Sequence, residues 1–383
     1  MVSSLLIAGA LFLFSACTSQ SGDTGLKTVR IAGNLPMTGS MGIYGQAIKD
    51  GAELAVEDLK RTDPTGNGFA IDWQDNAGDP ERAVNIFKSQ MSSEYDIYWS
   101  GVNQQNPTIK DQLDAEGMPH FVWILDAAIA DKRQGINSIK NNFRCWVNFK
   151  IEPSVFLNYA NAYKAKNVAI VYAQSPGAED EYKGTLIPAL KAMGISINLV
   201  DNYDPKSADY RAIALKVKDF KPHLIILSGS PQNFVGLIKA FKSRNLIHDG
   251  NTICSYELLD VGETLGQDEL EGVRVITPTF LTHLDNAGIK GWSERFYKKA
   301  KHWPSYTDAF AYDAINMLYD AARHIMLPAS SEQWVNALHA VKLDGVTGPL
   351  AFDSDGSLCT PVEVGVFQKG AIVSESQLKA AQK

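Results

Sequence analysis

The residues of this sequence best suited to chemistry are neutral polar side chains that follow short runs of β-forming residues. Three such segments read SGVNQQNP (100–107), SGSPQN (228–233) and SYELLD (255–260). Side chains of Ser, Asn, Gln and Tyr orient a small ligand through hydrogen bonds. Because ligands of α/β proteins bind beyond the carboxyl ends of the strands, we expect these loops to form a binding site.

Motifs for covalent, nucleotide or metal chemistry are missing from the sequence. It contains no GxxxxGK[ST], HExxH, CxxC, GxSxG or GxGxxG segment. The seven histidines are scattered, and His120 and His223 adjoin or lie within expected strands, so we interpret both as structural. We therefore expect no catalytic residue, no cofactor and no metal, and hence a protein that is not an enzyme.

Composition limits the class of protein further. The 383 residues carry 36 Lys and Arg against 43 Asp and Glu, for a formal net charge of -7. Without a basic stripe, nucleic acid is excluded as a partner. Cys145, Cys254 and Cys359 are too widely spaced for a zinc pattern or a disulfide framework, so buried thiols are expected, with one disulfide left open.

The elements that must position the polar loops alternate between strands and helices. TVRIAGNL (28–35) and FAIDWQD (69–75) are expected strands, and apolar residues between them recur at helical spacing from Ile48 to Leu59. The alternation continues with strands at NVAIVYA (167–173) and HLIILSGS (223–230). Repeated βα units predict an α/β protein with doubly wound parallel sheets, and the length of the chain predicts two lobes.

The N-terminus has the pattern of an exported protein. The apolar run from Leu5 to Ala16 is shorter than the roughly 20 residues of a membrane-spanning helix and stops at Cys17. Phe14 to Cys17 resembles the lipobox of bacterial lipoproteins, in which the cysteine is acylated. We therefore predict a signal peptide at 1–17 with lipidation at Cys17, and a tether at 18–26; an ordinary secretory signal is the alternative.

Six segments spread along the chain carry a family resemblance. They are GNLPMTGSMGIYGQAIKDGAELAVEDL (33–59), DNAGDPERAV (75–84), EGMP (116–119), NFR (142–144), GPLAFDSDG (348–356) and VGVFQKG (364–370). Together they resemble the solute-binding proteins of branched-chain amino-acid ABC importers, which are similar to leucine-binding protein and have the type I periplasmic binding protein fold.

The resemblance implies how the lobes are divided. Two α/β lobes would be joined by a hinge of three crossings and would close over the ligand. Lobe 1 would comprise 27–144 and 278–348, and lobe 2 would comprise 145–277 and 349–383. The resemblance further implies a monomer that delivers its solute to a membrane permease.

In the first lobe, the resemblance nominates four ligand-binding residues. Tyr44 matches a tyrosine that lines the cleft, and Asn103 occupies the position of a serine that holds the ligand carboxylate. Ile124 would contribute its backbone only. Asp126 replaces a threonine that contacts both ends of an amino acid. The structural alternatives are packing for Tyr44, a turn for Asn103 and a helix N-cap for Asp126.

In the second lobe, Tyr182 and Ser230 fall near two tyrosines of the family. Glu257 matches the glutamate that pairs with the ligand ammonium; a solvated loop charge is the alternative. If Asp126 and Glu257 both face the cleft, two acids would favour a cationic or amide-like ligand over a simple zwitterion.

The sequence therefore predicts an extracytoplasmic, lipid-anchored receptor of an ABC importer in the periplasm or on the outer face of the membrane. Its ligand is expected to be a small polar solute, first of all an amino acid. A short amide, urea or aromatic acid remains the alternative ligand. A ligand-free lipoprotein that regulates a cell-envelope enzyme is the alternative function.

Overall fold

The computed structural model describes most of the chain that follows the N-terminal segment. The described residues are 27–381, apart from Ser40, 102–108, 110–111, Asp114, 124–140, 147–150, 176–177, Ser207 and Asp249. Four predicted residues therefore lie outside the described part: Cys17, Asn103, Ile124 and Asp126.

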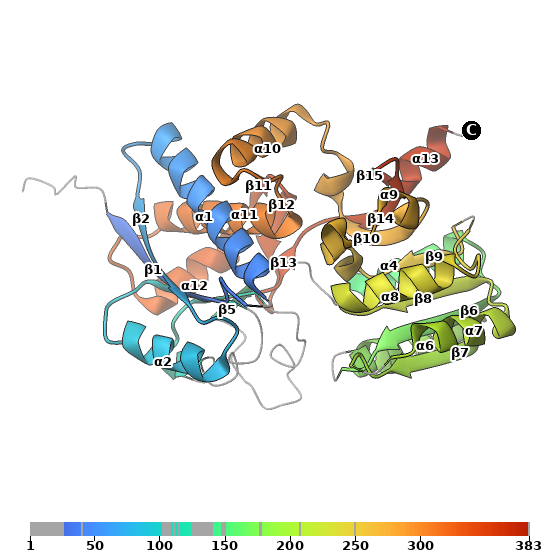
Figure 1. Ribbon diagram of the computed structural model, residues 1–383. Helices are drawn as coiled ribbons and strands as arrows, with labels where there is room; N and C mark the ends of the chain where they lie inside the picture. Colours follow the sequence, from blue (N-terminus) through green and yellow to red (C-terminus); the bar gives the residue numbers. More distant parts are fainter. Residues whose placement is uncertain are drawn as a thin grey trace, which may run out of the picture.

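The first lobe is built on a parallel sheet that, within the described residues, has five strands in the order β2-β1-β3-β4-β5. These strands are β1 (Thr28–Leu35), β2 (Gly68–Asp75), β3 (Ile97–Ser100), β4 (His120–Val122) and β5 (Asn142–Arg144). The helices of this lobe are α1 (Gly42–Thr62), α2 (Pro80–Gln90), α10 (Ala287–Ala300), α11 (Tyr306–Arg323) and α12 (Ser331–Ala340). Figure 1 shows them around the blue strands.

The second lobe contains a sheet whose described strands run in the order β15-β14-β10-β9-β8-β6-β7. They are β6 (Asn167–Ala173), β7 (Ser196–Tyr203), β8 (Leu224–Ser228), β9 (Thr252–Cys254), β10 (Arg274–Pro278), β14 (Val362–Gln368) and β15 (Ala371–Ser374). The longer helices are α4 (Glu152–Ala162), α6 (Ile187–Ala192), α7 (Tyr210–Phe220), α8 (Pro231–Lys242) and α13 (Glu375–Ala381). The α/β class with two parallel-sheet lobes is thus confirmed, although β14 and β15 join antiparallel.

Burial explains why these segments form strands. Every residue of β8 (LIILS) is buried, because a parallel strand covered by helices on both faces needs apolar side chains throughout. Within β4, His120 lies between Ser100 Oγ at 2.8 Å and Asn142 Oδ1 at 2.9 Å, which supports its structural interpretation. Cys145 and Cys254 are buried free thiols, as expected, whereas the free thiol of Cys359 is exposed.

The chain passes from one lobe to the other later than predicted at two of its crossings. The short helix η6 (Thr279–Thr282) still packs against β14 and β15, and α10 is the next element, against α1, so the chain crosses between Thr282 and Ala287 rather than at 277–278.

The last crossing differs more. β12 (Gly348–Phe352) pairs with β11 (Leu343–Gly345) and β13 (Leu358–Cys359), and Phe352 packs on Phe143 of the first lobe with ring centroids 4.9 Å apart. Arg144 N donates to Gly356 O at 2.7 Å. The chain therefore crosses between Cys359 and Val362, not near Gly348.

Helices α1 and α11 of the first lobe pack closely because of a glycine. A Cβ placed on Gly51 would lie 2.1 Å from the carbonyl oxygen of Asp308, and 3.1 Å from the Cβ of Ala311. No side chain fits in that space, so Gly51 sets the separation of the two helices. Among the described helices, none is both long and apolar enough to cross a bilayer.

We expect Gly51→Ala to destabilise the protein by about 1–3 kcal/mol, since overpacking forces two backbones apart. Urea unfolding measures the change in the free energy of unfolding. Gly184→Ala is the matched control, because a Cβ at Gly184 meets nothing within 4 Å. Equal stability of the two variants would contradict the close packing.

Candidate ligand-binding site

One carboxylate joins the two lobes. Asp260 belongs to the 3-10 helix η5 (Tyr256–Thr264), which follows β9 of the second lobe. Its Oδ2 accepts a hydrogen bond at 3.0 Å from the hydroxyl of Tyr44 on α1, and another from the hydroxyl of Tyr306 on α11. Two helices of the first lobe therefore present their tyrosines to a single acid of the second.

Glu257 lies one turn before Asp260 on the same short helix. Residues three apart in a 3-10 helix project on the same side, so both carboxylates face one region. Ser255, which is buried, donates its hydroxyl to Glu257 Oε2. Tyr256, which directly precedes Glu257, donates its backbone N–H to Glu152 Oε1 at 3.2 Å. This hydrogen bond places a third acid, from the start of α4, next to η5.

A fourth acid, Glu181, comes from the π-helix η4 (Glu179–Leu186). The charge of Glu181 helps to raise the pKa of Glu152, and Glu181 Oε1 is buried with no hydrogen-bond partner among the described residues. Ile187 N donates to Tyr182 O, five residues earlier, and this wider turn is typical of functional sites in otherwise α-helical segments. We call Glu152, Glu181, Glu257 and Asp260 the acid cluster.

Burial and mutual repulsion keep protons on the acid cluster. Burial, followed by the charge of Glu257, raises the pKa of Glu181 to about 8. Burial likewise raises the pKa of Glu257 to about 7 and that of Asp260 to about 6, and holds the pKa of Glu152 well above its usual value. Among the described residues, no Lys, Arg or His forms an ion pair with any of the four. The acid cluster is therefore prepared to receive positive charge or to donate protons.

Aromatic rings line the first-lobe side of the contact. Trp146 packs edge-on against Tyr306 at 5.1 Å, against Trp123 at 5.0 Å and against Tyr44 at 6.2 Å between centroids. Trp123 and Trp146 are each 1% exposed and belong to the core. These rings fix the two tyrosines that reach Asp260.

The four predicted residues within the described part have different surroundings. Tyr44 and Glu257 both lie beside Asp260. Tyr182 is 1% exposed and stacks on Tyr172 at 4.7 Å, so its ring is part of the core next to Glu181. The hydroxyl of Ser230 is 3.0 Å from Asn233 Oδ1 in the capping box of α8, so it serves that helix N-terminus.

Sequence reasoning missed several residues of this region. Asp260 could have been nominated from the sequence, because it lies three residues after Glu257 in SYELLD. Glu152, Glu181 and Tyr306 carry no local signal, because they meet the η5 helix only through tertiary packing across long separations in the sequence.

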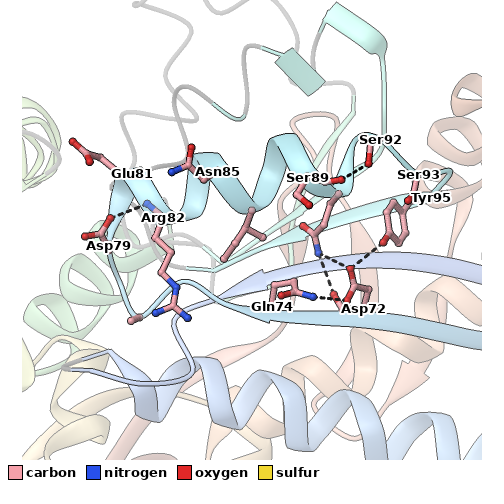
Figure 2. A pocket seen from close by; sticks show the side chains of 13 residues that line it. Asp72, Gln74, Asp79, Glu81, Arg82, Asn85, Ser89, Ser92, Ser93 and Tyr95 are labelled. Atoms are coloured by element: carbon pink, nitrogen blue, oxygen red, sulfur yellow. Dashed lines mark hydrogen bonds between the residues drawn. The ribbon is translucent and has the colours of Figure 1, made fainter.

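A separate hollow of about 980 Å³ lies along α2 of the first lobe (Figure 2). Several of its polar groups bond to one another: Asp72 accepts from Gln74 at 2.8 Å and from Tyr95 at 2.9 Å, and Asp79 caps Arg82 N at 2.8 Å. None of the predicted site residues lines it. We therefore do not assign ligand binding to this hollow.

Comparisons with known proteins converge on one family. A family profile described as periplasmic binding protein matches residues 28–371. The Leu/Ile/Val-binding protein homolog 2 of Brucella abortus is 22% identical over 349 residues, which are 88% of this chain and 89% of that protein.

Solved structures share the fold. The branched-chain amino acid transporter substrate binding protein LivJ of Streptococcus pneumoniae, in complex with isoleucine, matches 90% of this chain and 98% of its own, with a TM-score of 0.73 and 18% identity. A solute binding protein of an ABC transporter from Rhodopseudomonas palustris, in complex with 3,4-dihydroxy benzoic acid, matches 91% of this chain and 95% of its own. The TM-score is 0.76 and the identity is 16%. At these identities the likeness establishes the fold.

The raised pKa values of the acid cluster predict that the unliganded protein loses stability as pH rises from 6 to 8. Carboxyl groups with folded pKa values near 7 and 8 bind protons that the unfolded chain, with a carboxyl pKa of about 4.3, has already lost. For each proton that the folded state binds in excess of the unfolded chain, the free energy of unfolding falls by up to about 1.4 kcal/mol for every unit by which pH rises. Urea unfolding at pH 6, 7 and 8 measures the slope.

Other groups titrate in the same sense, including Asp308 and His302. The informative quantity is therefore the difference between variants. Glu181→Gln should flatten the slope, whereas the exposed control Asp268→Asn should leave it unchanged. A slope in Glu181→Gln equal to that of the parent would show that Glu181 does not hold a proton in this pH range.

Proposed function

Because the chain belongs to the periplasmic binding protein family, whose members bind solutes and are not enzymes, we propose that it captures an amine-bearing solute, in the first place an amino acid, between its two lobes. It is the solute-binding protein of an ABC transporter and acts outside the cytoplasm. Ligand capture and delivery to a permease would follow from closure of the lobes, with no covalent chemistry.

The observation that carries this proposal is the acid cluster beside the contact between Asp260 and the first-lobe tyrosines. Four carboxyl groups without a described cationic partner create a negative potential as they lose their protons, and this potential attracts an ammonium group. Glu257 is the member we propose as the partner of the ligand amine. The same potential opposes a solute whose only charge is a carboxylate, such as an aromatic acid.

An amino acid also carries a carboxylate, which must be kept away from the acid cluster. We propose that Asn103 and backbone N–H groups of the first lobe hold it, at the opposite end of the ligand. Asp126 would face the same end and would select against carboxylates held close to it. Ile124 would contribute its backbone, Tyr182 would support Glu181 from the core, and Ser230 would act through the N-terminus of α8, which it caps.

A neutral amide or urea is the second candidate, and the raised pKa values favour it. A carboxyl group that keeps its proton near neutral pH, as Glu181 does with a pKa of about 8, can donate a hydrogen bond to an amide oxygen. The two candidates differ in their pH dependence. An amine competes with protons for the acid cluster and binds more weakly as pH falls, whereas an amide needs those protons.

A thermal-shift screen over amino acids, polyamines, amides, urea and aromatic acids tests the proposal. A true ligand at 100 times its Kd adds about 2.7 kcal/mol to the stability of the folded protein. For an amine ligand, Glu257→Gln should weaken binding at least about 30-fold, because it removes one partner of a buried charge pair worth about 2–5 kcal/mol. Calorimetry at pH 6 and pH 8 measures Kd for both proteins.

Asp268→Asn, which removes an exposed charge from the same lobe, should bind like the parent. The amine proposal fails if the best ligand binds Glu257→Gln with unchanged affinity, or if its affinity rises as pH falls. A protein that responds to no solute in the screen would instead favour a ligand-free regulatory role.

We also propose that the protein is held at the membrane through Cys17, because the apolar N-terminal run stops at that cysteine. Cys17→Ala should shift the protein from the membrane fraction to the soluble fraction, since stable anchoring requires more than one acyl chain and these attach at the cysteine. Cys359→Ala, at an exposed free thiol, is the matched control and should stay with membranes. Mass spectrometry finding an unmodified mature N-terminus other than Cys17 would refute the anchor.

A further inference from the structure

A second cluster of charged groups lies in the first lobe, away from the acid cluster of η5. Asp50 is on α1, Asp308 is in the first turn of α11, and His302 lies in the connection between α10 and α11. One side-chain donor atom of each lies within 4.8 Å of the other two. The neighbouring Gly51 makes this meeting possible, because it lets α1 approach the backbone at Asp308. Figure 1 shows α1 and α11 in the first lobe.

Each carboxylate is held by one oxygen, which leaves the other oxygen available. Asp50 Oδ1 accepts from Gln46 Nε2 at 2.8 Å, and Asp50 Oδ2 is 3.5 Å from His302 Nε2. Asp308 Oδ2 accepts from the backbone N–H and hydroxyl of Ser305 at 2.7 and 2.6 Å. Asp308 is 1% exposed, and its Oδ1 has no hydrogen-bond partner among the described residues.

The histidine is oriented in the same way. His302 Nδ1 lies 3.0 Å from the carbonyl oxygen of Trp303, to which it donates its proton. Metal-binding histidines likewise donate one ring N–H to a carboxylate, a backbone carbonyl or water, and bind the metal through the other nitrogen. In neutral His302, Nε2 then directs a lone pair toward Asp50 Oδ2, and two acceptors at 3.5 Å need a positive centre near them.

A proton on His302 Nε2 would satisfy Asp50 but would leave Asp308 Oδ1 buried without a partner, at a cost in free energy. A cation bound by all three groups satisfies every one of these atoms. We propose that Asp50, His302 and Asp308 form a binding site for a divalent transition-metal ion of the Zn²⁺ type, with one imidazole nitrogen and two carboxylate oxygens as ligands.

The geometry requires only a small adjustment. Zn–N and Zn–O bonds are about 2.0–2.2 Å long, so ligand atoms on one ion are roughly 3.3 Å apart. His302 Nε2 and Asp50 Oδ2 are already 3.5 Å apart. The His302 side chain is about half exposed, at 49%, and lies outside the helices, so it can move toward Asp308. Imidazole selects against Mg²⁺ and Ca²⁺, which prefer ligand sets made of oxygen alone.

Isothermal titration of the chelator-treated, solute-free protein with ZnCl₂ tests the site directly. We expect one Zn²⁺ per chain, a rise in Tm and no response to MgCl₂. His302→Gln and Asp50→Asn should each weaken Zn²⁺ binding at least about tenfold, since even indirect supports of metal sites are worth 10–100-fold. Asp50 is chosen over Asp308 because the buried Asp308 also caps α11.

His324→Gln, at an exposed histidine beyond the end of α11, is the matched control and should bind Zn²⁺ like the parent. Absence of saturable Zn²⁺ binding, or binding that survives both His302→Gln and Asp50→Asn, would overturn the proposal and leave His302 as a protonated partner of Asp50. The measurement uses no solute, so its outcome is independent of the proposed ligand.

Discussion

A carboxylate removed from water must be neutralised by a proton, by hydrogen-bond donors or by a cation, and this constraint organises the contact between the two lobes. Asp260 meets it with two tyrosine hydroxyls from the opposite lobe, so lobe contact and charge compensation are the same interaction. Glu152 and Glu181 meet it by retaining protons, since burial raises the pKa of both carboxyl groups. The described residues do not supply a cation, and the amine of the proposed ligand would provide one.

The donors to Asp260 depend on how α1 and α11 are held. Tyr44 and Tyr306 start from neighbouring helices whose separation is set by Gly51, and Trp146 packs against both tyrosine rings. A change in the separation of α1 and α11 would therefore displace the two tyrosine hydroxyls that contact Asp260. The first turn of α11 carries both Tyr306 and Asp308, so the lobe contact and the proposed metal site share one rigid support.

The alternation of βα units was sufficient to predict the fold class, because hydrophobic periodicity is local. β6 at Asn167–Ala173 coincides with its predicted segment for this reason. The last crossing was misjudged, since pairing of Gly348–Phe352 with β11 and β13 is set by tertiary contacts such as the packing of Phe352 on Phe143. The site shows the same division. Glu257 follows a strand and could be nominated, whereas Glu152 reaches Tyr256 N from 104 residues away.

The π-helical turn that carries Glu181 has an evolutionary consequence. A π turn holds one more residue than an α turn, so deletion of a single residue from η4 would restore α-helical hydrogen bonding and rotate the preceding residues by about 100°. Glu181 would then leave the acid cluster while Leu186 and α6 kept their places in the core. Deletion of one codon in η4, rather than a series of substitutions, would thus be the shortest route to a protein with a less acidic region beside η5 and a different preference among solutes.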